Sequence, residues 1–269
     1  MQLPVRFRQT AILHALGLIP AADNLPLTVR EANGTTRSAV VSADPEQPHW
    51  KLPEAAPYPD DWVYLPATLE TPLPLCLRNP DIDYWYEYLP ERRTVYFQFN
   101  HVRDAPGESL ATFCDRLFRF IEANPVERLV LDMRFNDGGN TYLEIPLLHH
   151  LIASKVNYKG GLFVIIGRRT FSAAQNGSCY IDFHTNAIFV GEPTGSRPIF
   201  IGETAYFDLP YSGCQANISD LNWVGTWPGD FRTWIAPTLY TPPTFAAFSQ
   251  NRDPAMEAIL DYREQLPVG

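Results

Sequence analysis

Lysine is scarce in this sequence, and long apolar runs and clusters of basic residues are missing from it. Residues 162–166 are typical of its longest apolar runs, which fall far short of the roughly 18–20 residues that span a bilayer. Thirty acidic residues against 21 basic ones give a formal charge of −9, and such a chain is a poor ligand for nucleic acid. The first residues lack the charged, apolar and small-residue order of a signal peptide. We therefore expect a soluble chain with no membrane span and no nucleic-acid partner, and its localisation stays open.

The four cysteines do not form the pattern of a metal site. None of them belongs to a CxxC pair, and no histidine lies at zinc-ligand spacing from them. One falls on the apolar face of an expected helix, where a free thiol behaves as a small apolar group. We interpret them as buried free thiols and leave disulfide pairing open; they are Cys76, Cys114, Cys179 and Cys214.

Apolar residues and proline are abundant. Apolar residues make up 45% of the chain and charged residues 19%, which supports a sizeable core and rules out wholesale disorder. Many of the 25 prolines lie in the first ninety and the last seventy residues, so the middle is the regular part. We expect an N-terminal segment over residues 1–75, with a short helix, a hairpin at Asn33-Gly34 and a proline-rich connector. A core domain over residues 76–269 follows it.

Strand and helix patterns alternate from residue 94 onward. Short apolar runs are separated by segments in which apolar residues recur every three or four positions. Strands that are apolar on both faces, separated by helices, indicate an α/β fold with a mainly parallel sheet. The expected strands cover 95–99, 129–133, 162–166 and 187–190, the expected helices cover 110–121, a stretch ending near 154 and 172–183, and a hairpin within 205–218 and a helix from Asp253-Pro254 follow.

Two loops leave the carboxyl ends of these strands, where open α/β sheets bind ligands. The loop at 134–140 contains Gly138-Gly139, whose backbone amides can face an anion because no Cβ blocks the approach. The second loop places Ser172 where a strand turns into a helix, a position that suits an attacking oxygen beside unpaired amides. Each loop also has a simpler interpretation, a tight turn for the first and a helix N-cap for the second.

Three motifs taken together resemble family S41 serine peptidases. They are Leu-Asp-Met-Arg-Phe-Asn-Asp-Gly-Gly-Asn at 131–140, Arg-Thr-Phe-Ser-Ala-Ala-Gln at 169–175 and Gly-Glu-Pro-Thr-Gly at 191–195. The family comprises tail-specific or C-terminal-processing proteases, and the tricorn core is a relative. The resemblance covers roughly residues 76–262. It implies a crotonase/ClpP-like core, with the N-terminal segment as a partial PDZ-like or irregular module.

The resemblance implies roles for single residues. Ser172 matches the nucleophile, and the Ala173 amide, with an amide from Gly138 or Gly139, matches the oxyanion hole. No metal or organic cofactor is implied, and the substrate is expected to be a peptide or an unfolded protein. Arginines near these loops suit the binding of a substrate carboxylate, and the candidate substrate-binding residues are Arg169 and Arg197.

The general base departs from the family pattern. The tail-specific branch has a lysine 25 residues after the serine, and here that position holds Arg197. Arginine stays protonated in proteins and cannot accept the serine proton. The only lysines of the chain are Lys51, Lys155 and Lys159. The serine–lysine dyad is therefore absent.

The tricorn-like branch uses a serine, a histidine and an acid. Its acid lies nearly sixty residues after the serine, which matches Asp230, 58 residues after Ser172. Its histidine comes from a helical region before the core, so we expect this chain to be an N-terminally truncated member. His101 is the best substitute within the chain, because it follows the strand at 95–99 on the expected active-site edge. A solvated loop position is an equally good interpretation of His101 and of Asp230.

The sequence thus predicts a serine-type endopeptidase of the S41 kind, which is inactive as given unless a base is available. The rival hypothesis is a non-catalytic module that binds a ligand or peptide on the same fold, as in the repeats of interphotoreceptor retinoid-binding protein. Members of the S41 family are often exported. The peptide specificity and the oligomeric state stay open.

Overall fold

The chain divides into two compact units, residues 1–62 and 63–269. The second unit begins thirteen residues before the predicted domain start at residue 76. The residues between these two starts, 63–75, belong with the core. Asn251 Nδ2 donates to the carbonyl oxygens of Pro66, at 2.9 Å, and Thr71, at 2.8 Å. The computed structural model describes residues 10–31, 33–43, 64–211, 213 and 215–263.

The first unit holds a short helix and a hairpin, as the sequence predicts. The helix is α2 (Thr10–Ala15), and the antiparallel strands are β1 (Asn24–Arg30) and β2 (Thr36–Ser42). Gly34 in the connecting turn has a φ of 86°, which explains why this position suits glycine. Residues 44–63 of the expected proline-rich connector lie outside the described residues, and the PDZ-like character of the segment stays a prediction.

A six-stranded sheet with the order β10-β7-β6-β5-β4-β3 forms the centre of the second unit. β3 runs antiparallel to β4, and the other neighbouring pairs are parallel. This arrangement confirms the predicted α/β fold with a mainly parallel sheet. The strands are β3 (Tyr84–Leu89), β4 (Thr94–Phe99), β5 (Arg128–Asp132), β6 (Leu162–Ile166), β7 (Ile188–Gly191) and β10 (Leu239–Tyr240).

The connecting helices begin and end close to the positions that the sequence predicts. Ser109 Oγ accepts a hydrogen bond from Thr112 N at 3.2 Å and caps α4, and Asp253 Oδ1 accepts from Ala255 N at 3.1 Å and caps α8. The helices are α3 (Leu75–Arg78), α4 (Leu110–Ala123), α5 (Ile145–Ala153), α6 (Ala173–His184), α7 (Phe245–Phe248) and α8 (Pro254–Asp261), with 3₁₀ turns η1 (Leu65–Thr68), η2 (Pro90–Arg92) and η3 (Thr141–Glu144).

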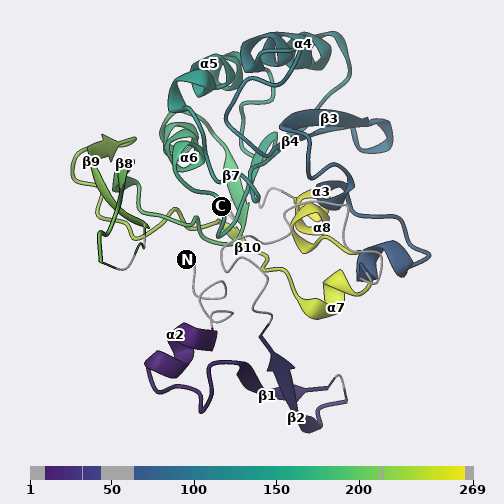
Figure 1. Ribbon diagram of the computed structural model, residues 1–269. Coiled ribbons are helices and arrows are strands. Elements are labelled where there is room, and N and C mark those ends of the chain that lie inside the picture. Colours follow the sequence, from purple (N-terminus) through teal and green to yellow (C-terminus); the bar gives the residue numbers. More distant parts are fainter. Residues whose placement is uncertain (1–9, 32, 44–63, 212, 214, 264–269) are drawn as a thin grey trace. The chain divides into compact units, whose positions relative to one another are not determined.

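Helices cover both faces of the sheet, with α4, α5 and α6 on one side and α3 and α8 on the other (Figure 1). Alternate residues of a strand face opposite sides. Phe97 and Leu131 accordingly pack in the cluster with α4, α5 and α6, whereas Tyr96 and Val130 pack in the cluster with Met256 of α8. Both faces are buried, which is why the central strands are apolar almost throughout.

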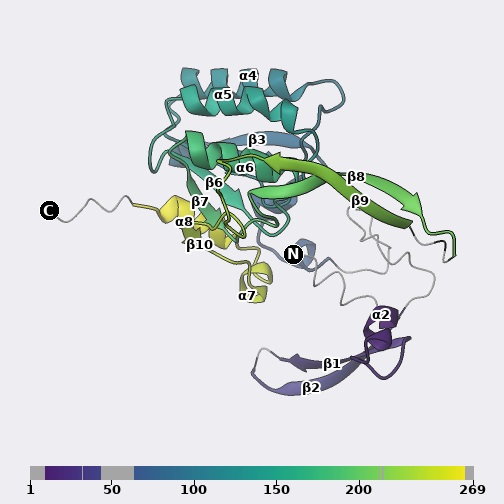
Figure 2. The same cartoon turned by 90° about the vertical axis from the view of Figure 1, so that its left-hand side faces the viewer.

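A long hairpin leaves the sheet region after β7. Its strands β8 (Ile199–Asp208) and β9 (Gln215–Val224) pair only with each other among the described residues, and they extend away from the helical layers (Figure 2). The hairpin is longer than the expected one within 205–218. Its base contacts the site loops, because the rings of Phe200 and Phe171 lie 6.3 Å apart between centroids.

The cysteines of the described residues are free and buried, as predicted for Cys76, Cys114 and Cys179. Burial raises the pKa of Cys114 and of Cys179 to about 12, so these thiols are protonated at neutral pH. Cys214 lies outside the described residues. Within the described part of the chain, no helix has the length and apolar character that a membrane crossing requires.

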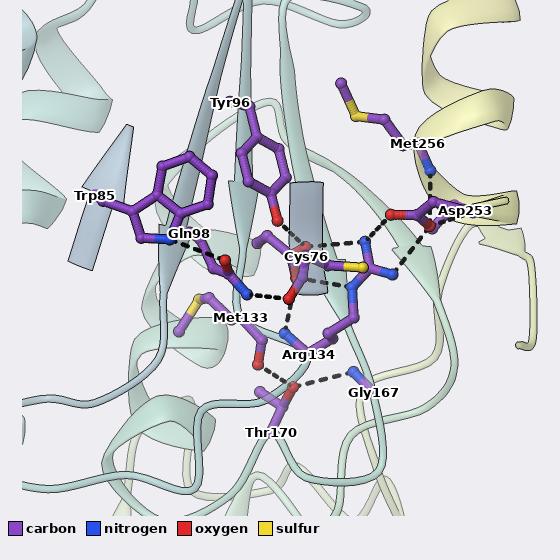
Figure 3. Close-up of polar contacts among 12 residues, drawn as sticks. Cys76, Trp85, Tyr96, Gln98, Met133, Arg134, Gly167, Thr170, Asp253 and Met256 are labelled. Atoms are coloured by element: carbon purple, nitrogen blue, oxygen red, sulfur yellow. Dashed lines mark hydrogen bonds and ion pairs between the residues drawn. The ribbon is translucent and has the colours of Figure 1, made fainter. Parts of the chain in front are cut away.

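A buried ion-pair network joins the end of β5 to the start of α8. Arg134 Nε donates to Asp132 Oδ1 at 3.0 Å, and its two terminal nitrogens donate to the Asp253 carboxylate at 2.9 and 2.8 Å. Tyr96 Oη donates to Asp132 Oδ2 at 2.7 Å. Figure 3 shows the guanidinium of Arg134 directed toward Asp253. The network fixes the first residue of the glycine loop that follows.

We expect Arg134→Met to destabilise the fold by about 3–5 kcal/mol, because it leaves two buried carboxylates without a cation. Urea unfolding followed by circular dichroism measures this loss. Arg252→Met is the matched control, since its ion pair with Glu257 is exposed and should contribute little to stability. Equal losses for the two variants would contradict the structural role of the buried network.

Candidate active site

Ser172 occupies the turn between β6 and α6 with a strained backbone. Its φ of 55° and ψ of −124° lie outside the regions that side chains favour, at a cost of about 1–3 kcal/mol. The side chain makes no capping hydrogen bond to α6, so the interpretation of Ser172 as a mere N-cap does not hold. The residue is half-buried, and its hydroxyl bonds to no other described residue. A strained strand-to-helix turn of this kind is typical of serine nucleophiles.

Gly138 packs directly against this turn. A Cβ at Gly138 would lie 2.6 Å from the Ser172 Cβ and 2.9 Å from the Ala173 nitrogen, so no larger residue fits without displacing them. Phe171 N donates to the Asn136 carbonyl oxygen at 3.1 Å and joins the same two loops. The glycine loop and the serine turn therefore meet at one place on the sheet edge.

Val102, which follows β4, holds the glycine loop from its other side. Val102 N donates to the Gly138 carbonyl oxygen at 2.9 Å, and Asn140 N donates to the Val102 carbonyl oxygen at 2.8 Å. A Cβ at Gly139 would lie 2.1 Å from that carbonyl oxygen, which explains the need for a second glycine. The glycine loop is thus hydrogen-bonded to the backbone of Val102, and these bonds fix its position.

Two backbone amides of this region lack an acceptor among the described residues. Gly138 N donates to Asn136 Oδ1 at 3.0 Å and is already used. Gly139 N has no such partner, and Ala173 N is in the first turn of α6, where helix amides are unpaired and the dipole is positive. Of the predicted pair of glycine amides, only that of Gly139 is therefore available to an oxyanion.

His101 lies between β4 and Val102, next to an acid that the sequence analysis did not consider. Its buried Nδ1 is 3.1 Å from Asp83 Oδ1, although the angle is not that of an aligned hydrogen bond. The histidine side chain is 35% exposed and the Asp83 side chain 6%. His101 is therefore not a freely solvated loop histidine.

Asp230 has a different set of partners from the predicted one. Its carboxylate accepts from Arg232 Nε at 2.9 Å and from a terminal nitrogen at 2.8 Å, and these hydrogen bonds lower the pKa of Asp230. Arg232 also donates to Asp182 at 2.8 Å, ten residues after Ser172 and so about 15 Å along α6. Asp230 makes no contact with His101 among the described residues, and its carboxylate is paired with Arg232, so its role as the acid stays a prediction.

The arginines near the site divide into paired and free groups. Arg169 donates to Asp137 Oδ2 at 3.2 Å across the two site loops, with both side chains about half exposed. Arg197 is exposed and makes no ion pair with a described residue. Arg168 pairs with Glu192 at 2.8 Å. Arg169 and Arg197 thus remain accessible to a ligand, and their substrate-binding role stays a prediction.

A cavity of about 410 Å³ lies beyond the carboxyl ends of β6 and β7, on the side of α7 and α8. Its walls are mainly apolar, and Arg168 and Arg169 border it from the serine loop. Ser172 is not part of its lining. The cavity is therefore separate from the serine turn, and the apolar residues that form it are Leu77, Phe135, Ile165, Ile166, Ala247 and Phe248.

Sequence reasoning missed Asp83 and Val102. Neither belongs to a recognisable motif, because their roles depend on the antiparallel pairing of β3 with β4 and on a single bridge between Val102 and Gly139. The signal available in the sequence was the strand pattern of residues 84–89, which begins directly after Asp83. Among the described residues, no group of three His, Cys, Asp or Glu side chains is arranged to hold a metal ion.

Comparisons with known proteins concern the fold. No protein-family model and no curated protein matches this chain. A candidate peptidase from Parabacteroides merdae ATCC 43184 aligns with a TM-score of 0.51 and 17% identity, over 67% of this chain and 65% of that one. Mature CPAF aligns with a TM-score of 0.51 and 12% identity, over 90% and 66%. A candidate S41 protease from Bacteroides fragilis NCTC 9343 gives 0.46 and 17%, over 65% and 56%.

The first two alignments show that the chain shares its fold with a candidate peptidase and with CPAF. The S41 resemblance is thereby confirmed at the level of the fold. At identities of 17% and 12%, the alignments say nothing of individual residues. The chain spans 65% and 66% of the lengths of these two proteins, so about a third of each has no aligned counterpart.

Behind the serine turn, Glu144 is buried against α6. A Cβ at Gly177 would lie 2.5 Å from Glu144 Oε1, so α6 approaches the carboxyl group closely. Neither carboxyl oxygen has a hydrogen-bond partner among the described residues, and burial raises the pKa of Glu144 well above its ordinary value. Burial therefore favours the neutral, protonated form of this carboxyl group.

We expect Glu144→Gln to raise the free energy of unfolding at pH 7. The folded pKa is above the unfolded value of about 4.3, so ionisation favours the unfolded chain and lowers stability as the pH rises above that value. The gain should disappear below about pH 4, where glutamate is protonated in both states. Urea unfolding at several pH values measures it. Glu257→Gln, at an exposed site, is the control, and a gain that does not vary with pH would contradict the assignment.

Proposed function

We propose that this protein is a serine-type endopeptidase of the S41 kind. The observation that carries the proposal is the strained, uncapped Ser172 at the positive end of α6, in contact with the glycine loop. Such strain persists only where the surrounding structure enforces it, and it clusters at functional sites. The fold shared with a candidate peptidase supports the same conclusion.

The reaction would be acyl transfer to Ser172. Its Oγ attacks the peptide carbonyl carbon while a base takes the hydroxyl proton, and the amides of Gly139 and Ala173 stabilise the resulting oxyanion. The protonated base then gives its proton to the leaving amine, and the C–N bond breaks. Water then attacks the carbonyl carbon of the acyl-enzyme while the base takes its proton. The ester bond to Ser172 breaks, the base returns the proton to Oγ, and the acid product leaves.

His101 is the proposed base. Arg197 stands at the position of the family's lysine and cannot accept a proton. The hydrogen bond from Val102 to Gly138, and the contact of Gly138 with Ser172, limit the distance from His101 Cα to Ser172 Cβ to roughly 12 Å. The two residues are thus neighbours at one edge of the sheet, which supports His101 as the base. Active-site contacts of this kind often tighten only when substrate binds.

The proposed substrate is a peptide segment of an unfolded protein. Main-chain pairing of an added strand would bind such a segment with little regard to its sequence. The base of the β8–β9 hairpin provides apolar side chains beside the site, because Phe200 contacts Phe171 and the Trp223 ring lies 6.3 Å from Tyr142. Tyr142 and Phe171 are exposed, so they are accessible to a substrate side chain.

We expect a fluorophosphonate probe to label the purified chain at Ser172, and Ser172→Ala to abolish both labelling and hydrolysis of an unfolded protein. Peptide mass spectrometry locates the label. Ser172→Gly is a second test, because it removes the nucleophile and also the backbone strain, and should raise the free energy of unfolding by about 1 kcal/mol. Labelling that persists in Ser172→Ala would exclude this serine as the nucleophile.

The mainly apolar cavity favours a second candidate function, a non-catalytic module that binds a small apolar ligand. A volume of about 410 Å³ is within the range of ligand sites, which are usually apolar with a few polar groups. Arg168, Arg169 and Arg252 border the cavity and supply charge at its margin. On this hypothesis the serine would have no chemical role.

We expect Ala247→Phe to weaken the binding of the fluorophore 1-anilinonaphthalene-8-sulfonate at least tenfold if the cavity is a ligand site. Ala247 is buried and lines the cavity, so the larger side chain would fill it. Fluorescence titration measures the effect. Ile201→Ser, which removes an exposed apolar group on the hairpin, is the control; an equal loss in both variants would indicate surface binding instead.

A further inference from the structure

Asp83 precedes β3 and contacts the proposed base. β3 and β4 are antiparallel, with Tyr84 opposite Phe99, so the residue before β3 lies beside the residues that follow β4. The Asp83 carbonyl oxygen accepts hydrogen bonds from Asn100 N at 2.7 Å and from His101 N at 3.3 Å. The backbone thus fixes Asp83 next to His101 independently of their side chains.

The side chains of this pair lie close together, although the angle at His101 Nδ1 is not that of an aligned hydrogen bond. Asp83 Oδ1 lies 3.1 Å from Nδ1 of His101, and this nitrogen is buried. Nε2 is then the nitrogen left for proton transfer. In a catalytic triad the acid contacts Nδ1, holds the ring in the tautomer that leaves Nε2 as acceptor, and stabilises the imidazolium that forms. The carboxylate of Asp230 is instead paired with Arg232, which also donates to Asp182 of α6.

Arg103 contacts the same carboxylate. Its Nε donates to Asp83 Oδ1 at 2.7 Å, and the arginine side chain is 62% exposed. The cation therefore offsets part of the negative charge that His101 meets. The other acids of this region, Asp104 and Glu108, lie around the Tyr84 hydroxyl. Among the described residues, Asp83 is the charged group in contact with His101, and Arg103 acts on it through Asp83.

We propose that Asp83 is the positioning residue for His101, in place of the acid at 230, and that Arg103 adjusts its effect. The inference rests on the proposed function, because the pair has a catalytic role only if Ser172 is a nucleophile. It predicts opposite effects of the two neighbours on the basicity of the imidazole. A purely structural pair would not transmit these effects to the rate at which Ser172 reacts.

The test measures the rate of Ser172 labelling by a fluorophosphonate probe from about pH 5 to pH 9 in the full chain. Labelling requires neutral His101, so the rate rises with pH through a midpoint. Asp83→Asn should lower the maximal rate ~10- to 100-fold and move the midpoint to lower pH, by roughly one pH unit. Arg103→Gln should move the midpoint to higher pH. Asp81→Asn, an exposed neighbour, is the matched control and should change neither.

A double-variant comparison separates positioning from folding. In a His101→Gln background, Asp83→Asn should cause no further loss of rate, because its effect passes through the histidine. Unchanged rate and midpoint in Asp83→Asn, with Ser172 still labelled, would overturn the assignment, as would a full additional loss in the His101→Gln background. Absence of labelling in the unmodified chain would instead remove the proposed function itself.

Discussion

The edge of the sheet that carries Ser172 depends on the buried guanidinium of Arg134. It compensates Asp132 at the end of β5 and Asp253 at the start of α8, and it is also the first residue of the glycine loop. Two carboxylates can be buried together there only because the cation lies between them. Arg134 anchors the glycine loop at one end and Val102 holds it at the other, which together position Gly138. Ser172 packs against Gly138.

The site then combines strain, close packing and unpaired amides. Glycine at 138 and at 139 is required because backbone and side-chain atoms occupy the space of any Cβ, at 2.6 and 2.1 Å. This close packing holds Ser172 in a conformation that the residue would not adopt alone. Within the described part of the chain, the amides of Gly139 and Ala173 have no acceptor, and amides of this kind can stabilise a negative charge.

The order of strands and helices could be predicted from sequence because it follows from local periodicity. The run at 129–133 and the apolar spacing from Leu110 to Ile121 each determine one element with little help from the rest of the chain. The two loops could be predicted from their motifs, since few other residue types could take the place of the glycine pair or of Ser172 in the same chemistry. Asp83 was not found, because its neighbour His101 is eighteen residues away and only the β3–β4 register joins them.

The Arg134–Asp253 contact links residues that are 119 positions apart in the chain. During synthesis, the glycine loop leaves the ribosome long before the aspartate that completes its anchor. Until the last helix has emerged and packed, Arg134 has only half of its counter-charge. Before α8 packs, a nascent chain therefore lacks half of the charge that anchors the glycine loop. The synthesis and packing of α8 thus determine when this edge of the sheet acquires its final shape.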